Sequence, residues 1–164
     1  MSPSDSHRPW WSWPLLIVAL PLVVVWMIVW SAAAISLLLV VWTTWCPRGR
    51  YALVVYSNSP VWQPYFEARV LPAIRDRAIV LNWSERKRWT FSFPVALFNL
   101  FAGSRDFNPV VIVFEPWKWP RRFRFYQPFQ AFKHGRGEAV EQMRVDVIRL
   151  LDHLTVNASS SPDR

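Results

Sequence analysis

The sequence has no Asp, Glu, Lys, Arg or His in a run of 37 residues, from position 10 to position 46. A helix needs about 20 apolar residues to cross the hydrocarbon core of a bilayer. At about 1.5 Å per residue this run would form a helix of roughly 55 Å, against a core of about 30 Å. We therefore expect residues 10–46 to be a membrane anchor.

Cysteine is almost absent, because Cys46 is the only one in the chain. A single cysteine excludes an intramolecular disulfide, a Cys-x-x-Cys redox pair and a cysteine-based zinc site. Its place at the end of the apolar run leaves two interpretations, a palmitoylated thiol or a buried, unreactive one. We favour the buried thiol.

Catalytic motifs are missing as well. The chain has only four glycines, with no Gly-rich phosphate loop and no Gly-x-Ser-x-Gly motif. His134 and His153 are isolated and lack the partner spacing of a metal site. The candidate acids have no informative spacing; they are Glu67, Asp76, Glu85, Asp106 and Glu115. We therefore expect no catalytic residue, no metal and no cofactor.

The apolar run is long enough for two arrangements. A single helix of about 20–25 residues could span the membrane, or the run could fold back as a hairpin with arms of about 12–16 residues. Seven of the twelve tryptophans lie here in three groups, at positions 10, 11 and 13, at 26 and 30, and at 42 and 45. Three groups would suit the headgroup levels of a hairpin. We favour the single span, because the arms are short and no Gly or Asn supplies a turn near Ser31.

Basic residues set the expected orientation. Arg8 is the only Lys or Arg before the run, whereas Arg48 and Arg50 follow it directly. By the positive-inside rule, the carboxy-terminal domain is expected in the cytoplasm, at a membrane such as the bacterial inner membrane. Residues 1–9 and 155–164 are expected to be disordered tails. The cytoplasmic domain would then cover residues 47–154.

Apolar patterns in this domain alternate between strands and helices. Short apolar runs predict strands at residues 51–56, 78–81, 110–114 and 122–125. Helices are predicted from Pro60, with interruptions at Pro64 and Pro72, at residues 94–101, and in the last segment. The last helix carries the apolar stripe Val140, Met143, Val147, Leu150, Leu151 and Leu154. Pro128, in the continuation of the fourth strand, indicates a sheet edge.

The predicted order is β-α-β-α-β-β-α, which indicates an α/β fold with a mixed sheet. This order resembles that of the thioredoxin fold, in which a proline precedes the third strand, as Pro109 does here. The resemblance covers element order over residues 51–154. It implies the fold alone, because residues 57–62 read Ser-Asn-Ser-Pro-Val-Trp where the redox cysteines would stand. A flavodoxin-like or other small α/β sheet is the alternative.

Polar side chains follow the first two predicted strands. They are Ser57, Asn58 and Ser59 after the first, and Asn82, Ser84, Glu85, Arg86, Lys87 and Arg88 after the second. Ligands of open α/β sheets bind beyond the carboxyl ends of the strands, and helix amino termini attract anions, so a phosphate site is conceivable. The simpler interpretation makes Ser59 a helix cap, Asn58 a turn residue and the charged run a solvated loop. We favour it because no Gly-rich loop is present.

Two clusters combine basic and aromatic residues. The first is Arg86, Lys87, Arg88 and Trp89; the second is Trp117, Lys118, Trp119, Arg121, Arg122 and Arg124. Such clusters suit nucleic acid or a membrane surface. The anchor favours anionic headgroups, near which each basic side chain is worth about 1 kcal/mol. Alternatively, Phe123 and Phe125 belong to a strand core and the arginines simply face solvent.

The net charge of +8 lies almost entirely after the anchor, and 16 of the 19 basic residues are Arg. We therefore predict a membrane-anchored, non-catalytic binding module that engages a partner protein or anionic lipid headgroups. The alternative is a membrane-bound enzyme acting on a phosphorylated or lipid-linked substrate through Ser57, Asn58, Asn82, Ser84, Glu85 and Arg86. Nucleic-acid binding is a third, weaker alternative.

Overall fold

The computed structural model describes residues 12–103, 109–133 and 137–159. Its internal contacts divide the chain into two compact units, Met1–Leu37 and Leu38–Arg164. The predicted tail at residues 1–9 lies outside the described residues, and so do the candidate side chains Asp106 and His134.

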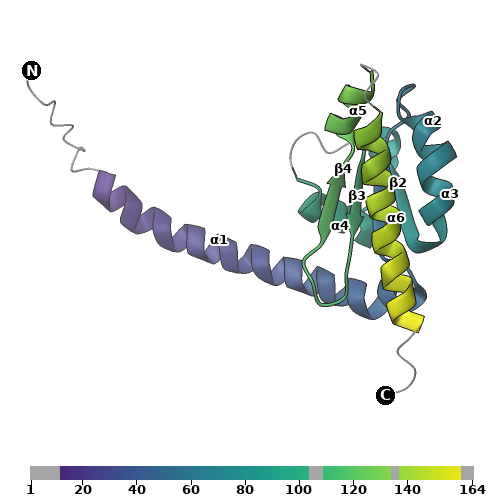
Figure 1. The fold of residues 1–164 in the computed structure, drawn as a ribbon. Helices are drawn as coiled ribbons and strands as arrows, with labels where there is room; N and C mark the ends of the chain where they lie inside the picture. The colour runs from purple at the N-terminus through teal and green to yellow at the C-terminus, as the bar shows by residue number, and fades with distance from the viewer. Residues whose placement is uncertain (1–11, 104–108, 134–136, 160–164) are drawn as a thin grey trace, which may run out of the picture. The chain divides into compact units, whose positions relative to one another are not determined.

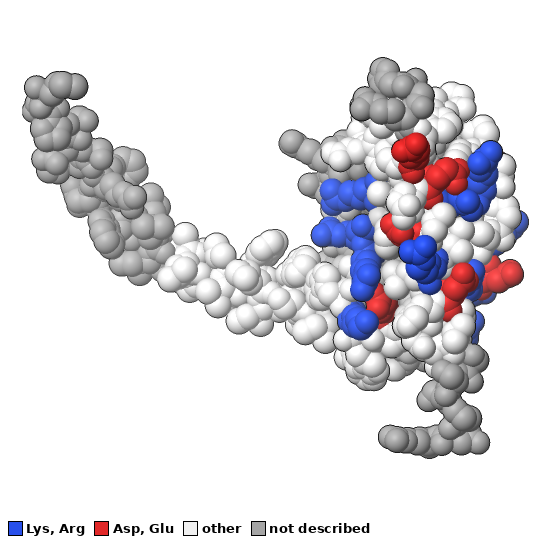
Figure 2. Space-filling model, viewed as in Figure 1, with Lys and Arg blue, Asp and Glu red and all other residues white. Residues whose placement is uncertain are grey.

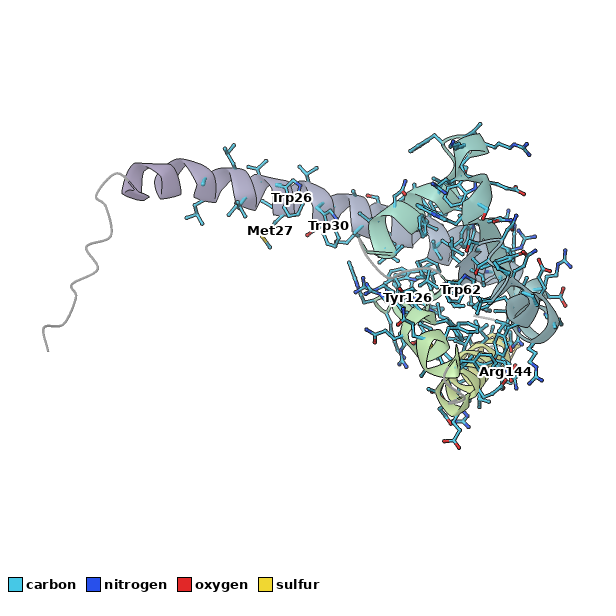
Figure 3. The ribbon with its side chains drawn as sticks, turned by 90° about the horizontal axis from the view of Figure 1, so that it is seen from above. Trp26, Met27, Trp30, Trp62, Tyr126 and Arg144 are labelled. Carbon is cyan, nitrogen blue, oxygen red and sulfur yellow. The ribbon has the colours of Figure 1, made fainter. Side chains whose placement is uncertain are left out.

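The first unit is dominated by one long helix, α1 (Ser12–Val40), which contains Pro21 without a break (Figure 1). The chain from Ala19 to Arg48 is long and apolar enough to cross a membrane. Trp26, Met27 and Trp30 stand out from the helix surface in Figure 3, and the Trp26 side chain is 66% exposed. Residues 12–40 form one continuous helix, so the alternative in which the run folds back as a hairpin is wrong.

The end of the apolar run belongs to the second unit. After α1 the chain continues through a π-helical turn, Val41–Trp45, and a 3-10 turn, Cys46–Arg48. Gly49 caps the end of the 3-10 turn with a φ of 72°, a left-handed conformation that glycine adopts without strain. Trp45 and Cys46 are buried, as are Leu38 and Val41. The burial of Cys46 confirms the interpretation of its thiol as a buried group.

A four-stranded mixed sheet forms the centre of the second unit. Its strands are β1 (Ala52–Tyr56), β2 (Ala78–Asn82), β3 (Val110–Val113) and β4 (Arg121–Arg124), in the order β2-β1-β3-β4. Strands β1 and β2 are parallel, whereas β3 is antiparallel to both β1 and β4. The two central strands are almost fully buried, as unbroken apolar runs predict. The expected α/β class and all four strands are confirmed.

The connection from β1 to β2 is helical but irregular, as the prolines predict. It consists of α2 (Gln63–Tyr65), a π-helical segment (Phe66–Val70), α3 (Leu71–Ile74) and a 3-10 turn (Arg75–Arg77). Pro64 and Pro72 lack an N–H group, so the regular ladder of helical hydrogen bonds cannot run through them. The stripe of Phe66, Val70 and Ile74 is nevertheless buried against the sheet.

Two further helices cover the sheet. Helix α4 (Phe93–Phe101) follows a 3-10 helix (Trp83–Arg88) and ends before Gly103, whose φ is 84°. Helix α6 (Glu138–Ser159) packs on β3 and beside α3. Arg121 lies beside α6 residues, whereas the neighbouring Arg122 reaches the Phe101 carbonyl of α4. Because successive strand residues face opposite sides, α6 and α4 cover opposite faces of the sheet.

The structure corrects two expectations near the carboxy terminus. Pro128 belongs to α5 (Tyr126–Lys133), which we did not predict, rather than to a continued strand. It occupies the first turn of that helix, where a missing N–H costs nothing. The edge position of β4 is nevertheless confirmed. Helix α6 also continues through residues 155–159, which we assigned to a tail, since no Pro or Gly interrupts it there.

Candidate functional site

The polar residues at the ends of β1 and β2 lie together, as the parallel pairing predicts. Asn82 donates from Nδ2 to Asn58 Oδ1 at 2.7 Å, and its own Oδ1 accepts from the Ser84 backbone N–H at 3.0 Å. Ser84 Oγ accepts from the Asn58 backbone N–H at 2.9 Å. These groups therefore bond to one another, and the network ties the end of β1 to the end of β2.

Ser57 and Ser59 have local roles. Ser57 Oγ accepts from Trp62 Nε1 at 3.4 Å, and Ser59 Oγ accepts from the Val61 backbone N–H at the same distance. Ser59 is not the helix cap that we expected, because α2 begins only at Gln63 and Trp62 precedes it. Trp62 also contacts α5, with ring centroids 6.1 Å from Tyr126 (Figure 3).

The first basic cluster lies on an exposed 3-10 helix. Glu85, Arg86, Lys87 and Arg88 are all exposed, as expected of a solvated segment. The Arg86 guanidinium lies 4.9 Å from the centroid of the Trp83 ring, a cation–π contact. Trp89 packs on Trp83 and on Phe98 of α4, at centroid distances of 5.7 and 5.8 Å. Sequence reasoning missed Trp83, although a Trp three residues before an Arg on a helical turn is a usable signal.

The second cluster is the turn between β3 and β4 together with β4 itself. In the turn, residues 115–120, the Lys118 N–H donates to the Glu115 carbonyl at 3.2 Å. Pro116 and Trp117 occupy the two middle positions, and Trp117 has a φ of 61°. Turns with a positive φ at the third position usually place Gly or Asn there. Within the described residues, Trp117 is the only non-glycine with positive φ.

Glu115 holds this turn in place. Its side chain is only 5% exposed, with Lys118 Nζ at 2.9 Å from one carboxylate oxygen and Arg121 Nε at 2.6 Å from the other. A buried carboxylate requires such pairing. We considered Glu115 only as one of several scattered acids; its position directly after a buried strand, with Lys118 three residues on, was the available signal.

Strand β4 presents the remaining arginines. Arg121, Arg122 and Arg124 are exposed, and Phe123 between them is half-buried, as a strand with one buried face predicts. Arg122 donates to the Phe101 carbonyl at 3.5 Å. Figure 2 shows basic side chains gathered over the part of the domain where Figure 1 places β4. No acid among the described residues pairs with Arg122 or Arg124.

Aromatic contacts join this cluster to the end of the apolar run. Trp117 is 78% exposed, yet its ring lies 5.1 Å from that of Trp42. Trp45 contacts Phe114, the residue after β3, at 6.0 Å. Trp119, which is 53% exposed, contacts Phe101 of α4 at 5.6 Å. Both basic clusters therefore border α4, the first through Phe98 and the second through Phe101.

A separate ion-pair network ties the first helical connection to α6. Glu141 accepts from Tyr65 Oη at 3.0 Å and from Arg144 Nε at 2.8 Å, with Arg69 Nη1 at 3.2 Å. The hydrogen bond from Arg144 is the main cause that lowers the pKa of Glu141. Burial, followed by the hydrogen bond to Glu141, raises the pKa of Tyr65 to about 12. This network joins the helical connection to α6 and includes no residue of either basic cluster.

Metal and cofactor sites have little support in the part of the chain that the structure describes. No group of three or more His, Cys, Asp and Glu residues there could hold a metal ion. A hollow of about 290 Å³ lies beside Tyr51, Glu115, Lys118 and His153, but both carboxylate oxygens of Glu115 already face cations.

No protein-family model matches this sequence, and comparison with curated proteins and with solved structures found no significant match.

Proposed function

We propose that this protein is a membrane-anchored, non-catalytic module that holds a basic, aromatic surface against anionic lipid headgroups. The surface consists of Trp117, Lys118, Trp119, Arg121, Arg122 and Arg124, together with Arg86, Lys87, Arg88 and Trp89; the two groups border α4 through Phe101 and Phe98. The observation that carries the proposal is the contact between Trp42, at the end of the apolar run, and Trp117 in this surface.

The proposal treats α1 as the anchor. An apolar helix with exposed Leu20, Trp26 and Ile28 side chains requires an apolar surrounding. The positive-inside rule supports a cytoplasmic domain, because Arg48 and Arg50 follow the apolar run. Protease digestion of a carboxy-terminal tag in intact and permeabilised cells tests this orientation: cleavage only after permeabilisation supports it, and cleavage in intact cells contradicts it.

We further propose that the domain is thioredoxin-like and has lost, or never had, redox function. The strand order β2-β1-β3-β4 with β1 and β2 parallel supports this, as does Pro109 directly before β3. Where a redox pair would follow β1, the chain has the hydrogen-bonded Ser57 and Asn58. A fold of this kind carries no disulfide chemistry without its cysteines.

Charge and exposure support headgroup binding over the other predicted roles. Arg122 and Arg124 are exposed, and the described residues offer them no acidic partner. Arg122 donates one N–H to the Phe101 carbonyl and has further N–H groups. Arg binds phosphate through paired hydrogen bonds. The enzyme alternative would use Asn58, Asn82 and Ser84, which the structure shows bonded to one another.

Hydrogen exchange of the full-length chain in lipid vesicles tests the proposal. Amides of β4 and of the 3-10 helix at Trp83–Arg88 should exchange more slowly in phosphatidylglycerol-containing vesicles than in phosphatidylcholine vesicles. The double substitution Arg122→Gln and Arg124→Gln should remove the difference at β4. Arg149→Gln, which removes one positive charge from an exposed position of α6, is the control and should leave it intact. Equal exchange in both lipids would contradict headgroup binding.

A further inference from the structure

We propose that the turn between β3 and β4 inserts Trp117 and Trp119 into the interfacial layer of the bilayer. This second membrane contact would lie beside the end of the apolar run. The inference rests on the proposed membrane location and adds a contact that does not depend on anionic lipid.

The backbone of the turn gives the first reason. Trp117 occupies the left-handed region, at a position where glycine would be unstrained. A bulky side chain is a genuine outlier there. Strain of this kind concentrates at functional positions, because the surrounding structure must hold the residue in place. The turn alone gives no reason for a tryptophan at this position.

The exposure of the two rings gives the second reason. Trp117 is 78% exposed and Trp119 is 53% exposed. Indole combines a large apolar surface with one N–H donor, so tryptophan concentrates at the headgroup level of membranes. Water is a poor surrounding for the apolar surface of both rings. The interfacial layer of a bilayer suits both the apolar surface and the N–H donor of each indole.

The neighbours of the turn identify the bilayer as the occupant. The Trp117 ring contacts Trp42, which lies in the final turn of the apolar run together with Trp45. The exposed tryptophans therefore extend the aromatic group that already marks the end of the proposed span. Lys118 and Arg121, which pair with Glu115, have side chains that are 64% and 57% exposed and place positive charge beside the rings. A six-residue turn is small for a stable protein interface, which buries about 800 Å² per partner.

Glu115 makes the turn rigid enough to present both rings. Its buried carboxylate pairs with Lys118 and Arg121, and its carbonyl accepts from the Lys118 N–H. These contacts fix the two ends of the segment that carries Trp117 and Trp119. Glu115 is therefore a positioning residue, and the turn needs no reordering when it enters the interface.

Hydroxyl-radical footprinting of the full-length chain tests the insertion. The chain is reconstituted in phosphatidylcholine vesicles at less than one chain per vesicle, and oxidation of each residue is measured by mass spectrometry relative to its unfolded peptide. Phe91, whose side chain is 93% exposed, is the internal control. Insertion predicts that Trp117 and Trp119 oxidise more slowly than their exposure implies, whereas Phe91 oxidises in proportion to its exposure, because indole rings at the headgroup level contact lipid.

Oxidation of Trp117 and Trp119 in proportion to their exposure would overturn the inference. The footprinting is repeated with phosphatidylglycerol present, and its result is compared with the hydrogen exchange of β4 in the same lipids. This comparison separates tryptophan insertion from binding to anionic headgroups. Protected tryptophans in both lipids, with no effect of anionic lipid on β4, would support insertion and contradict headgroup binding. Exposed tryptophans in both lipids, with protected β4 amides in anionic lipid, would contradict insertion alone.

Discussion

Trp42 and Trp117 contact each other with ring centroids 5.1 Å apart, although one ends the apolar run and the other lies in the turn between β3 and β4. This contact brings the end of the apolar run next to the second basic and aromatic cluster. Trp45 reinforces the connection through Phe114, at the end of β3. The domain therefore presents one particular surface beside the place where the chain leaves the apolar run.

Replacing Trp117 with glycine should stabilise the turn while removing the proposed membrane contact. Relief of the left-handed backbone strain is worth about 1 kcal/mol. Trp117→Ala is the matched control, because it removes the ring and keeps the strain. Thermal unfolding of the full-length chain in a mild detergent should place the glycine variant above the alanine variant by about that amount. Equal stabilities would show that the positive φ of Trp117 carries no strain.

Glu115→Gln should destabilise the domain by about 1–2 kcal/mol, because two cations then face a buried neutral amide. The loss is limited, since Lys118 and Arg121 are more than half exposed and can turn to water. Glu85→Gln on the exposed 3-10 helix is the control and should change stability by less than about 0.5 kcal/mol. Chemical denaturation followed by circular dichroism measures both variants, and equal effects would contradict the role of Glu115.

Asn82→Ala should lower the unfolding free energy by about 1 kcal/mol, because the side chain bonds both Asn58 and the Ser84 backbone. An enzyme that used Asn82 for its substrate would instead lose activity with little change in stability. Urea denaturation therefore discriminates between these roles. An unchanged denaturation midpoint would show that the network is dispensable for the fold and return Asn82 to the candidates for ligand binding.

Glu141→Gln should alter the pH dependence of stability at both ends of the pH range. The lowered pKa of Glu141 contributes stability that is complete above the ordinary glutamate pKa and is lost as the pH falls through the lowered value. Tyr65, whose pKa is raised to about 12, contributes stability that is complete below its ordinary pKa of 10.0 and is lost as the pH rises towards 12.

Urea midpoints measured from acid to alkaline pH test this change. The substitution should reduce the acid-side slope and weaken the alkaline loss, because it removes the carboxylate that bonds Tyr65. Asp146→Asn, on the same helix, is the control, since its nearest cation is Arg149 at 4.0 Å. Identical profiles for the native chain and the Glu141 variant would contradict the assigned coupling.

Local patterns in the sequence were sufficient for much of the fold. Unbroken apolar runs located β1 and β3, and the spacing of Phe66, Val70 and Ile74 identified a buried helix face despite two prolines. The proximity of Asn58 and Asn82 also followed, because the carboxyl ends of neighbouring parallel strands share one edge of the sheet.

Other features depend on contacts that no local pattern encodes. Pro128 is compatible with an edge strand and with the first turn of a helix, so α5 was missed. The role of Glu115 depends on Arg121, which reaches it only after β3 and β4 pair. The contact between Trp42 and Trp117 joins distant segments through tertiary packing, and hydrophobic periodicity carries no information about it.

Photo-crosslinking from lipid headgroups tests the central claim most directly. The full-length chain is reconstituted in vesicles that contain an anionic lipid with a photoreactive headgroup, and the crosslinked peptides are identified by mass spectrometry. We predict crosslinks concentrated between Trp117 and Arg124 and on the segment from Arg86 to Trp89, with few on the exposed residue Gln142 of α6. Crosslinks spread evenly over the domain, or concentrated on α6, would contradict the account.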